Sequence, residues 1–187
     1  YLKIVRAIPQ SETDEYEIAV PNIEITRVYQ NYFLSWLKKS TNSRQGEKML
    51  EALITGDVLN FEKILSQYMQ ETMSYFDFGE KIHPEKFYHA LVLGMLVYLK
   101  SSHQVSSNRE AGNGRYDVLI IPKDISKPGI ILEFKVAESE KSMNKEAKLA
   151  LAQINKQNYQ AELEARGIKK IVKLGIVFFG KKVIIKT

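Results

Sequence analysis

Apolar and polar positions alternate with a period of two in several segments of the chain, a pattern that predicts β-strands. Residues 1–7 and 16–20 carry this pattern on either side of the turn-rich stretch 9–14, which predicts a short hairpin. The polar loop 122–128 joins two later strands in the manner of a hairpin. These later strands are predicted at residues 104–109, 116–121, 129–136, 171–179 and 182–186.

Apolar residues recur at steps of three and four in other segments, which predicts amphipathic helices. Gly56 ends one helix and Asp57 caps the next. Pro84 opens a strongly apolar helix, and Gly167 ends a long one. The predicted helices are residues 23–39, 47–54, 58–73, 85–100 and 144–166. Interruptions are expected at the polar linker 40–46 and at residues 76–79.

The order of elements in residues 129–179 is strand, helix, strand, which implies two parallel strands joined by a right-handed crossover. The rest of the sheet is expected to be antiparallel. We therefore predict an α/β fold with a mixed sheet flanked by helices. This domain is expected to occupy residues 81–187, preceded by a small, mostly helical region at residues 1–80.

Composition narrows the class of protein. Of the 187 residues, 44% are hydrophobic and 26% charged, which is ordinary for a globular protein and argues against disorder, collagen or a coiled coil. The absence of Cys excludes a disulfide framework, a zinc ribbon and a thiol nucleophile, and it suits a reducing cytoplasm. The longest apolar run, residues 90–99, is too short to span a bilayer. We expect a cytoplasmic protein without a membrane partner.

Charge is distributed unevenly along the chain, whose net charge is +5. Residues 1–100 hold 11 Lys and Arg against 13 Asp and Glu, whereas residues 101–187 hold 16 against 9. No acidic residue follows Glu164. A basic half of this kind is what a surface that binds nucleic acid requires, because phosphate neutralisation dominates such binding. The alternative is a solvated, lysine-rich face.

Two of the predicted strands carry charges where a buried strand is expected to be apolar. Asp117 begins one hydrophobic run, and Glu133 and Lys135 lie inside another. The period of two puts Glu133 and Lys135 on the same face of their strand. If the strand of Asp117 is the antiparallel neighbour, all three charges converge at one end of the sheet.

Adjacent carboxylates of this kind predict a metal site. Like charges at short range disfavour ionisation, and a divalent cation removes that cost. Two or three oxygens on an open edge suit Mg²⁺ or Mn²⁺, which retain water molecules and bind phosphates. A lysine beside the cation can orient a water molecule and offset charge on a phosphoryl oxygen. Asp117, Glu133 and Lys135 therefore indicate phosphodiester hydrolysis.

Other interpretations of these residues remain open. Glu133 and Lys135 could form a cross-strand ion pair on an exposed edge, although their apolar flanks and the nearby Asp117 argue against it. His89, on an apolar helix, is more typical of a hydrogen-bonded core residue than of a ligand. Ser126 and Ser139 have no histidine partner within reach by sequence logic, so a serine–histidine triad has no support.

A family resemblance follows from these motifs. Asp117 followed by the run Glu133–Lys135, in two paired strands between two helices, resembles the PD-(D/E)XK nuclease superfamily. The resemblance covers about residues 80–187 and implies a restriction-endonuclease-like fold; Tyr116 stands where the superfamily pattern has proline. Segments that resemble a bacterial branch usually found behind an AAA-ATPase-like domain are residues 87–90, 107–117, 150–159 and 175–181.

The resemblance implies roles for single residues. Asp117 and Glu133 would be ligands of Mg²⁺, or of Mn²⁺, and Lys135 would position the nucleophilic water. Glu110 would be a further acidic ligand or lie just behind the ligands. Gln153 and Tyr159 are similar to a Gln and a Tyr that RecB-like nucleases place beside the metal, or they merely face the sheet. Residues expected to contact nucleic acid are Arg109, Arg115 and Lys156, although Arg115 could instead pair with Asp117.

The N-terminal segment extends the resemblance. Residues 1–2 and 20–24 look like the tail of the AAA-ATPase-like domain. The chain has no phosphate-binding Gly-rich loop with Lys and Ser or Thr, so the ATPase itself is not expected within it. The chain starts at Tyr1 without Met, so we expect its true N-terminus to be missing. The resemblance implies that an AAA-ATPase-like domain belongs to the same full-length protein.

The sequence therefore predicts a metal-dependent nuclease that acts on nucleic acid, with DNA favoured over RNA. The main alternative is a catalytically silent module that binds nucleic acid or protein and is attached to an AAA-ATPase-like domain. A third possibility is a purely structural C-terminal module of that ATPase. The intact set Asp117, Glu133 and Lys135 favours the first.

Overall fold

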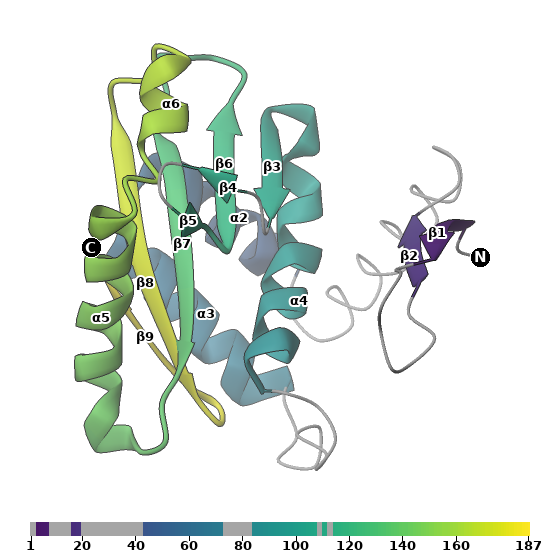
Figure 1. Ribbon diagram of the computed structural model, residues 1–187. Helices are drawn as coiled ribbons and strands as arrows, with labels where there is room; N and C mark the ends of the chain where they lie inside the picture. The colour runs from purple at the N-terminus through teal and green to yellow at the C-terminus, as the bar shows by residue number, and fades with distance from the viewer. Residues whose placement is uncertain (1–2, 8–15, 20–42, 73–83, 108–109, 112–113) are drawn as a thin grey trace. The chain divides into compact units, whose positions relative to one another are not determined.

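The computed structural model describes residues 3–7, 16–19, 43–72, 84–107, 110–111 and 114–187 (Figure 1). The chain divides into two compact units, Tyr1–Lys39 and Ser40–Thr187. In the first unit, β1 (Lys3–Ala7) and β2 (Tyr16–Ala19) pair as antiparallel strands, which confirms the predicted hairpin. The helix predicted at residues 23–39 and the interruption at residues 76–79 lie outside the described residues.

The second unit is built on a five-stranded sheet with the strand order β3-β6-β7-β8-β9. Strands β7 and β8 are parallel, and every other neighbouring pair is antiparallel. This arrangement confirms the predicted α/β fold with a mixed sheet. The strands are β3 (His103–Ser107), β6 (Val118–Pro122), β7 (Gly129–Val136), β8 (Ile171–Phe179) and β9 (Lys182–Lys186).

Helices cover both faces of this sheet (Figure 1). On one face, α5 (Met143–Lys156) and α6 (Ala161–Ala165) pack on a buried cluster that includes Ile131 of β7. On the other face, α4 (Pro84–Leu96) places Tyr88 in a stack on Phe178, with ring centroids 4.1 Å apart. Helix α4 passes into a 3-10 turn at Val97–Ser101, whereas the sequence predicts one continuous helix over residues 85–100. Among the described residues, none of the helices is both apolar and long enough to cross a membrane.

One predicted helix is interrupted. The sequence predicts a continuous helix over residues 144–166, whereas the structure has α5 and α6 separated by turn residues 157–160. Asn158 has a φ of 53°, in the left-handed region that an α-helix does not use. Gly167 follows α6 with a φ of 79°, as the predicted end of the helix requires.

Two other boundaries differ from the prediction. Helix α2 (Ser43–Thr55) begins inside the stretch predicted as a polar linker, because the buried side chains of Met49 and Leu53 stabilise the helix through packing. Strand β6 begins at Val118 and not at residue 116. The predicted helix signals between α2 and α3 (Val58–Thr72) are confirmed: Gly56 has a φ of 79°, and Asp57 Oδ1 accepts the Asn60 N–H at 3.2 Å.

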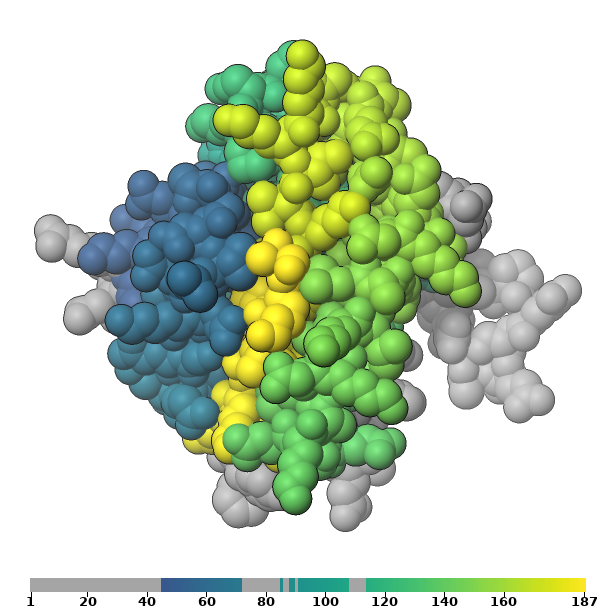
Figure 2. Space-filling view, turned by 90° about the vertical axis from the view of Figure 1, so that its left-hand side faces the viewer, coloured from purple at the N-terminus to yellow at the C-terminus, as the bar shows by residue number. Residues whose placement is uncertain are grey.

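Helix α3 lies along the edge strand β9, which runs between α3 and α5 (Figure 2). Four helical residues rise about 6 Å and two strand residues span about 6.6 Å, so side chains four apart stay in phase with alternate strand residues. Polar side chains of α3 accordingly bond the strand's main chain. The contacts are Ile185 N–H to Glu62 Oε2 at 3.2 Å, Ser66 Oγ to Val183 O at 3.5 Å and Gln70 Nε2 to Lys181 O at 3.3 Å.

Helices α2 and α3 belong to the same compact unit as the sheet, residues Ser40–Thr187. An edge strand otherwise presents main-chain groups to other chains, and here the polar side of α3 covers part of that edge. The predicted domain boundary between residues 80 and 81 stays a prediction.

We predict that Glu62→Ala lowers the free energy of unfolding by about 1–2 kcal/mol, because the partly buried Ile185 N–H loses its acceptor. Lys63→Ala, on the exposed side of the same helix, serves as the matched control and should change stability by less than about 0.5 kcal/mol. Urea unfolding followed by circular dichroism measures both. Equal effects of the two variants would contradict the role of Glu62 at the edge strand.

Gly175 of β8 permits a close approach of α5. A Cβ atom at this position would lie 2.7 Å from the Ala147 carbonyl oxygen and 3.0 Å from Ala150 Cβ. We predict that Gly175→Ala destabilises the protein by about 1–3 kcal/mol, because the helix must shift away. Gly46→Ala, in α2 with no heavy atom within 4 Å of the added Cβ, should be neutral or stabilise by up to about 1 kcal/mol. Thermal unfolding of the two variants checks this opposite behaviour.

Candidate active site

The candidate site lies where β6 and β7 stop pairing. The antiparallel register runs from Ile120↔Ile130 to Val118↔Leu132, and the next residues in this register are Asp117 and Glu133. Instead of continuing the ladder, the Phe134 N–H donates to Asp117 Oδ2 at 2.8 Å. The Asp117 side chain thus accepts the hydrogen bond that a main-chain carbonyl of the ladder would otherwise accept. Because residues opposite each other in a pair of strands share a face, the two carboxylates are brought together.

Glu133 is a buried carboxylate, with only 1% of its surface exposed. Its Oε1 lies 3.4 Å from Lys135 Nζ, and its Oε2 has no hydrogen-bond partner in the described part of the chain. The pKa of Glu133 is raised to about 7, chiefly by burial and also by the charge of Asp117, against the effect of Lys135, which lowers it. The burial excludes the alternative of a solvated ion pair on an exposed edge. An acid whose pKa lies this high is typical of a functional site.

Gln153 and Tyr159 lie on the α5 side of this site. Tyr159 is 1% exposed, and its hydroxyl donates to the Arg115 carbonyl at 2.7 Å. Burial raises the pKa of Tyr159, while a hydrogen bond with the Gln153 side chain lowers it. The charges of Glu133 and Asp117 also raise it, so this hydroxyl lies within electrostatic reach of the carboxylates. The structure therefore brings Gln153 and Tyr159 close to the site, with the Tyr159 hydroxyl directed at the main chain.

The other predicted site residues are described to different extents. Glu110 lies in β4 (Glu110–Ala111), which pairs with β5 (Gly114–Arg115), so Glu110 is opposite Arg115; the Glu110 side chain is outside the described residues. Arg109 also lies outside them. Arg115 and Lys156 are exposed, Lys156 at the last position of α5. Their roles in binding nucleic acid stay predictions.

Helix α4 forms a further side of this region. His89 Nε2 and Ser107 Oγ are hydrogen-bonded at 3.0 Å, and the His89 ring centroid lies 5.5 Å from that of Phe134. His89 thus has the hydrogen-bonded environment that the sequence favours. Glu85 is a residue that sequence reasoning missed: its charge adds to the raised pKa of Glu133. An acid in the first turn of a helix normally indicates only a favourable interaction with the helix dipole, so its pattern gives no sign of a site.

Two carboxylates and one ammonium group therefore meet at the open end of the β6–β7 ladder. In the described part of the chain, no three His, Cys, Asp or Glu side chains are grouped so that they could hold a metal ion. Mg²⁺ does not require such a cage, since it commonly binds one or two carboxylates and keeps several water molecules. The unpartnered Glu133 Oε2, next to Asp117, fits this requirement.

The raised pKa of Glu133 makes the stability of the protein depend on pH. The folded state binds the proton up to about pH 7, whereas an unfolded glutamate releases it near pH 4.5, so the Glu133 contribution to stability falls as pH rises between these values. We predict that Glu133→Gln, measured with a chelator, gains up to about 3 kcal/mol over the wild type between pH 4 and pH 8. Urea unfolding across this pH range measures it, with the exposed Glu138→Gln as control. Parallel pH profiles for Glu133→Gln and the wild type would contradict the prediction.

Comparison with known proteins agrees with this geometry. Residues 83–187, more than half of the chain, match the family model described as the PD-(D/E)XK nuclease superfamily. A search of curated proteins found no significant match. The matched region contains all five strands of the sheet and both candidate carboxylates. The chain therefore belongs to the PD-(D/E)XK nuclease superfamily.

Proposed function

We propose that this chain hydrolyses phosphodiester bonds of nucleic acid, DNA in preference to RNA, at the site formed by Asp117, Glu133 and Lys135. The observation that carries the proposal is the buried Glu133 carboxylate, which has an unpartnered oxygen and lies next to Asp117 in the strand register. A second acid beside a buried one raises the free energy of both unless a cation or a proton compensates. Membership of a nuclease superfamily supports phosphodiester hydrolysis as the chemistry.

The proposed cofactor is Mg²⁺, with Mn²⁺ as a substitute. Asp117 and Glu133 would hold the ion, and Glu110 would be a further acidic ligand or support. Asp117 is oriented for this by the hydrogen bond that its Oδ2 accepts from the Phe134 N–H. A bound divalent cation lowers the pKa of its water and neutralises charge on phosphoryl oxygens.

Lys135 would act on the water nucleophile. Its Nζ lies 3.4 Å from Glu133 Oε1, and 27% of its side chain is exposed, so the ammonium group is held at the carboxylate and still reaches solvent. From this position it would donate a hydrogen bond to the attacking water or stabilise negative charge on the phosphoryl group. Gln153 and Tyr159 are proposed to support the site from the α5 side.

The basic half of the chain supports a nucleic-acid substrate. Residues 101–187 carry 16 Lys and Arg against 9 Asp and Glu. An excess of positive charge in the part of the chain that carries the site would attract the phosphate backbone, and the acidic residues of the site would bind the cation. Arg109, Arg115 and Lys156 are proposed to contact phosphates. A location in the cytoplasm stays a prediction.

We also propose that an AAA-ATPase-like domain works with this chain, as the resemblance of residues 1–2 and 20–24 to the tail of such a domain implies. The β1–β2 hairpin lies between these two segments and is consistent with a folded element there. The nuclease assay below does not depend on this part of the proposal.

We predict that the chain cleaves DNA in the presence of Mg²⁺ or Mn²⁺ and not in EDTA. Asp117→Asn and Lys135→Ala should each lower the cleavage rate by at least about 100-fold. The first variant removes a proposed ligand of the cation, and the second removes the ammonium group that would stabilise charge on the phosphoryl group. Labelled single- and double-stranded DNA and RNA, separated on denaturing gels, measure the rates. Lys48→Ala, an exposed lysine of α2, is the control and should retain the wild-type rate.

Binding of nucleic acid without cleavage by the wild type would favour the alternative, a catalytically silent binding module. Cleavage that survives in both Asp117→Asn and Lys135→Ala would assign the activity to another site or to a contaminant. A preference for RNA over DNA would correct the proposed substrate and leave the proposed chemistry intact.

A further inference from the structure

The turn between α5 and α6 contacts three consecutive residues that lead to Asp117. We infer that residues 157–162 act as a clamp that positions Asp117 through Gly114, Arg115 and Tyr116. This inference rests on the proposed role of Asp117 at the metal site. The clamp is defined by the side chains of Gln157, Tyr159 and Glu162.

The segment before Asp117 needs such support because it lies outside the main sheet. β5 pairs only with β4, in a separate two-stranded sheet, and β6 begins at Val118. The five-stranded ladder therefore does not determine where residues 114–116 lie. A proline at position 116, as in the superfamily pattern, would restrict the backbone there. Tyr116 brings no such restriction, and its position must be fixed by contacts.

The first contact of the clamp is made by Gln157. A Cβ atom on Gly114 would lie 2.9 Å from Gln157 Cδ and 3.0 Å from its Oε1. The Gln157 side chain thus lies directly against the Gly114 backbone, in a space that a larger residue would fill. This contact holds the end of the β4–β5 hairpin against the turn.

The second contact is the hydrogen bond from the Tyr159 hydroxyl to the Arg115 carbonyl, at 2.7 Å. Tyr159 is almost fully buried, so its side chain has little freedom to leave this hydrogen bond. Its ring also meets the Tyr116 ring edge-on, with centroids 6.1 Å apart. Tyr159 therefore restrains two neighbouring residues, one through its hydroxyl and one through its ring.

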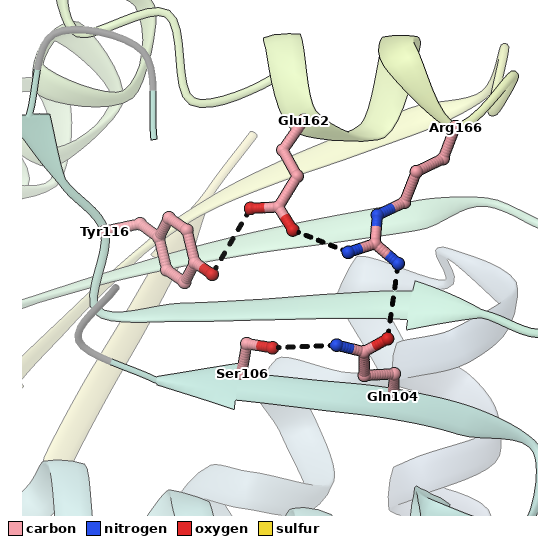
Figure 3. Close-up of polar contacts among 5 residues, drawn as sticks. All are labelled: Gln104, Ser106, Tyr116, Glu162 and Arg166. Carbon is pink, nitrogen blue, oxygen red and sulfur yellow. Dashed lines mark hydrogen bonds and ion pairs between the residues drawn. The ribbon is translucent and has the colours of Figure 1, made fainter. Parts of the chain in front are cut away.

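The third contact joins Tyr116 to α6 (Figure 3). The Tyr116 hydroxyl donates to Glu162 Oε2 at 3.4 Å, and Glu162 Oε1 accepts from Arg166 at 2.9 Å. Arg166 also donates to Gln104 Oε1 at 3.2 Å, which reaches β3. Figure 3 shows Glu162 between Tyr116 and Arg166, so Arg166 holds the carboxylate in place from the other side. The network ties Tyr116 both to α6 and to the edge of the sheet.

The clamp itself is anchored on the sheet. Leu163 of α6 is fully buried, and it packs so closely on β7 that a Cβ atom on Gly129 would lie 2.8 Å from its methyl groups. The helix break at Asn158, with its φ of 53°, turns the chain so that Tyr159 enters the interior while Leu163 reaches Gly129. An uninterrupted helix would carry residues 159–163 onward along the α5 axis.

The test measures the position of Asp117 without metal or substrate. The Phe134 amide donates to Asp117 Oδ2, so its hydrogen exchange reports on that carboxylate. In the full chain with EDTA, Tyr116→Phe, Tyr159→Phe and Glu162→Gln are compared by NMR with the wild type. We expect Phe134 exchange to become about fivefold faster relative to Leu132, an amide of the same strand, as the loss of one buried hydrogen bond implies. Glu164→Gln, an exposed acid of the same short helix, is the matched control and should leave the ratio unchanged.

The second readout is the affinity for Mn²⁺, measured by calorimetry, which should weaken about three- to tenfold in the three clamp variants and not in Glu164→Gln. A ratio of Phe134 to Leu132 exchange that stays constant in all three variants overturns the inference, because it means that the clamp contributes only to global stability. If the wild type neither binds Mn²⁺ nor cleaves nucleic acid, the proposed function fails, and the exchange ratio still decides whether the clamp positions Asp117.

Discussion

The end of main-chain pairing between β6 and β7 is the constraint on which the site depends. The register of the two strands stops at Val118 and Leu132, one step before Asp117 and Glu133. A buried amide needs an acceptor, and the Phe134 N–H finds it in Asp117 Oδ2 at 2.8 Å. This hydrogen bond replaces a rung of the ladder and orients one carboxylate beside another. Because main-chain pairing ends there, two acidic side chains lie next to each other, and the segment before Asp117 depends on the clamp for its position.

The burial of Glu133 has its origin in how closely the sheet is covered. Gly175 lies beside Glu133 in the parallel register of β7 and β8, and α5 comes close enough there for a Cβ atom to lie 2.7 Å from the Ala147 carbonyl. A helix at this distance excludes water from that face of the sheet. Burial is the largest cause of the raised pKa of Glu133, ahead of the charge of Asp117. The packing of a glycine therefore contributes to the electrostatics of the site.

The sequence predicts the parts of this arrangement that depend on period and order, and it fails where single contacts decide. Strand periodicity predicted β7 and the convergence of Asp117, Glu133 and Lys135, because neighbouring strands and a period of two leave few alternatives. The break at Asn158 was missed: Asn adopts a left-handed φ more readily than most residues, but as a polar residue it also fits the helical pattern of residues 144–166. The α3 contacts to β9 were missed for a similar reason: polar residues four apart indicate a solvated helix face, and here that face bonds to an edge strand.

Proton and cation binding are coupled in the proposed site. A carboxylate must be ionised to bind a cation, and burial keeps Glu133 protonated up to about pH 7 in the metal-free protein. A cation held by Asp117 and Glu133 would have to displace this proton, so its apparent affinity would fall as the pH drops below about 7. In either state the charge beside Asp117 is compensated, by a proton in one and by the cation in the other. The buried Glu133 beside Asp117 is therefore tolerated in the folded protein before any cation binds, and Lys135, 3.4 Å from Glu133 Oε1, lowers the remaining repulsion.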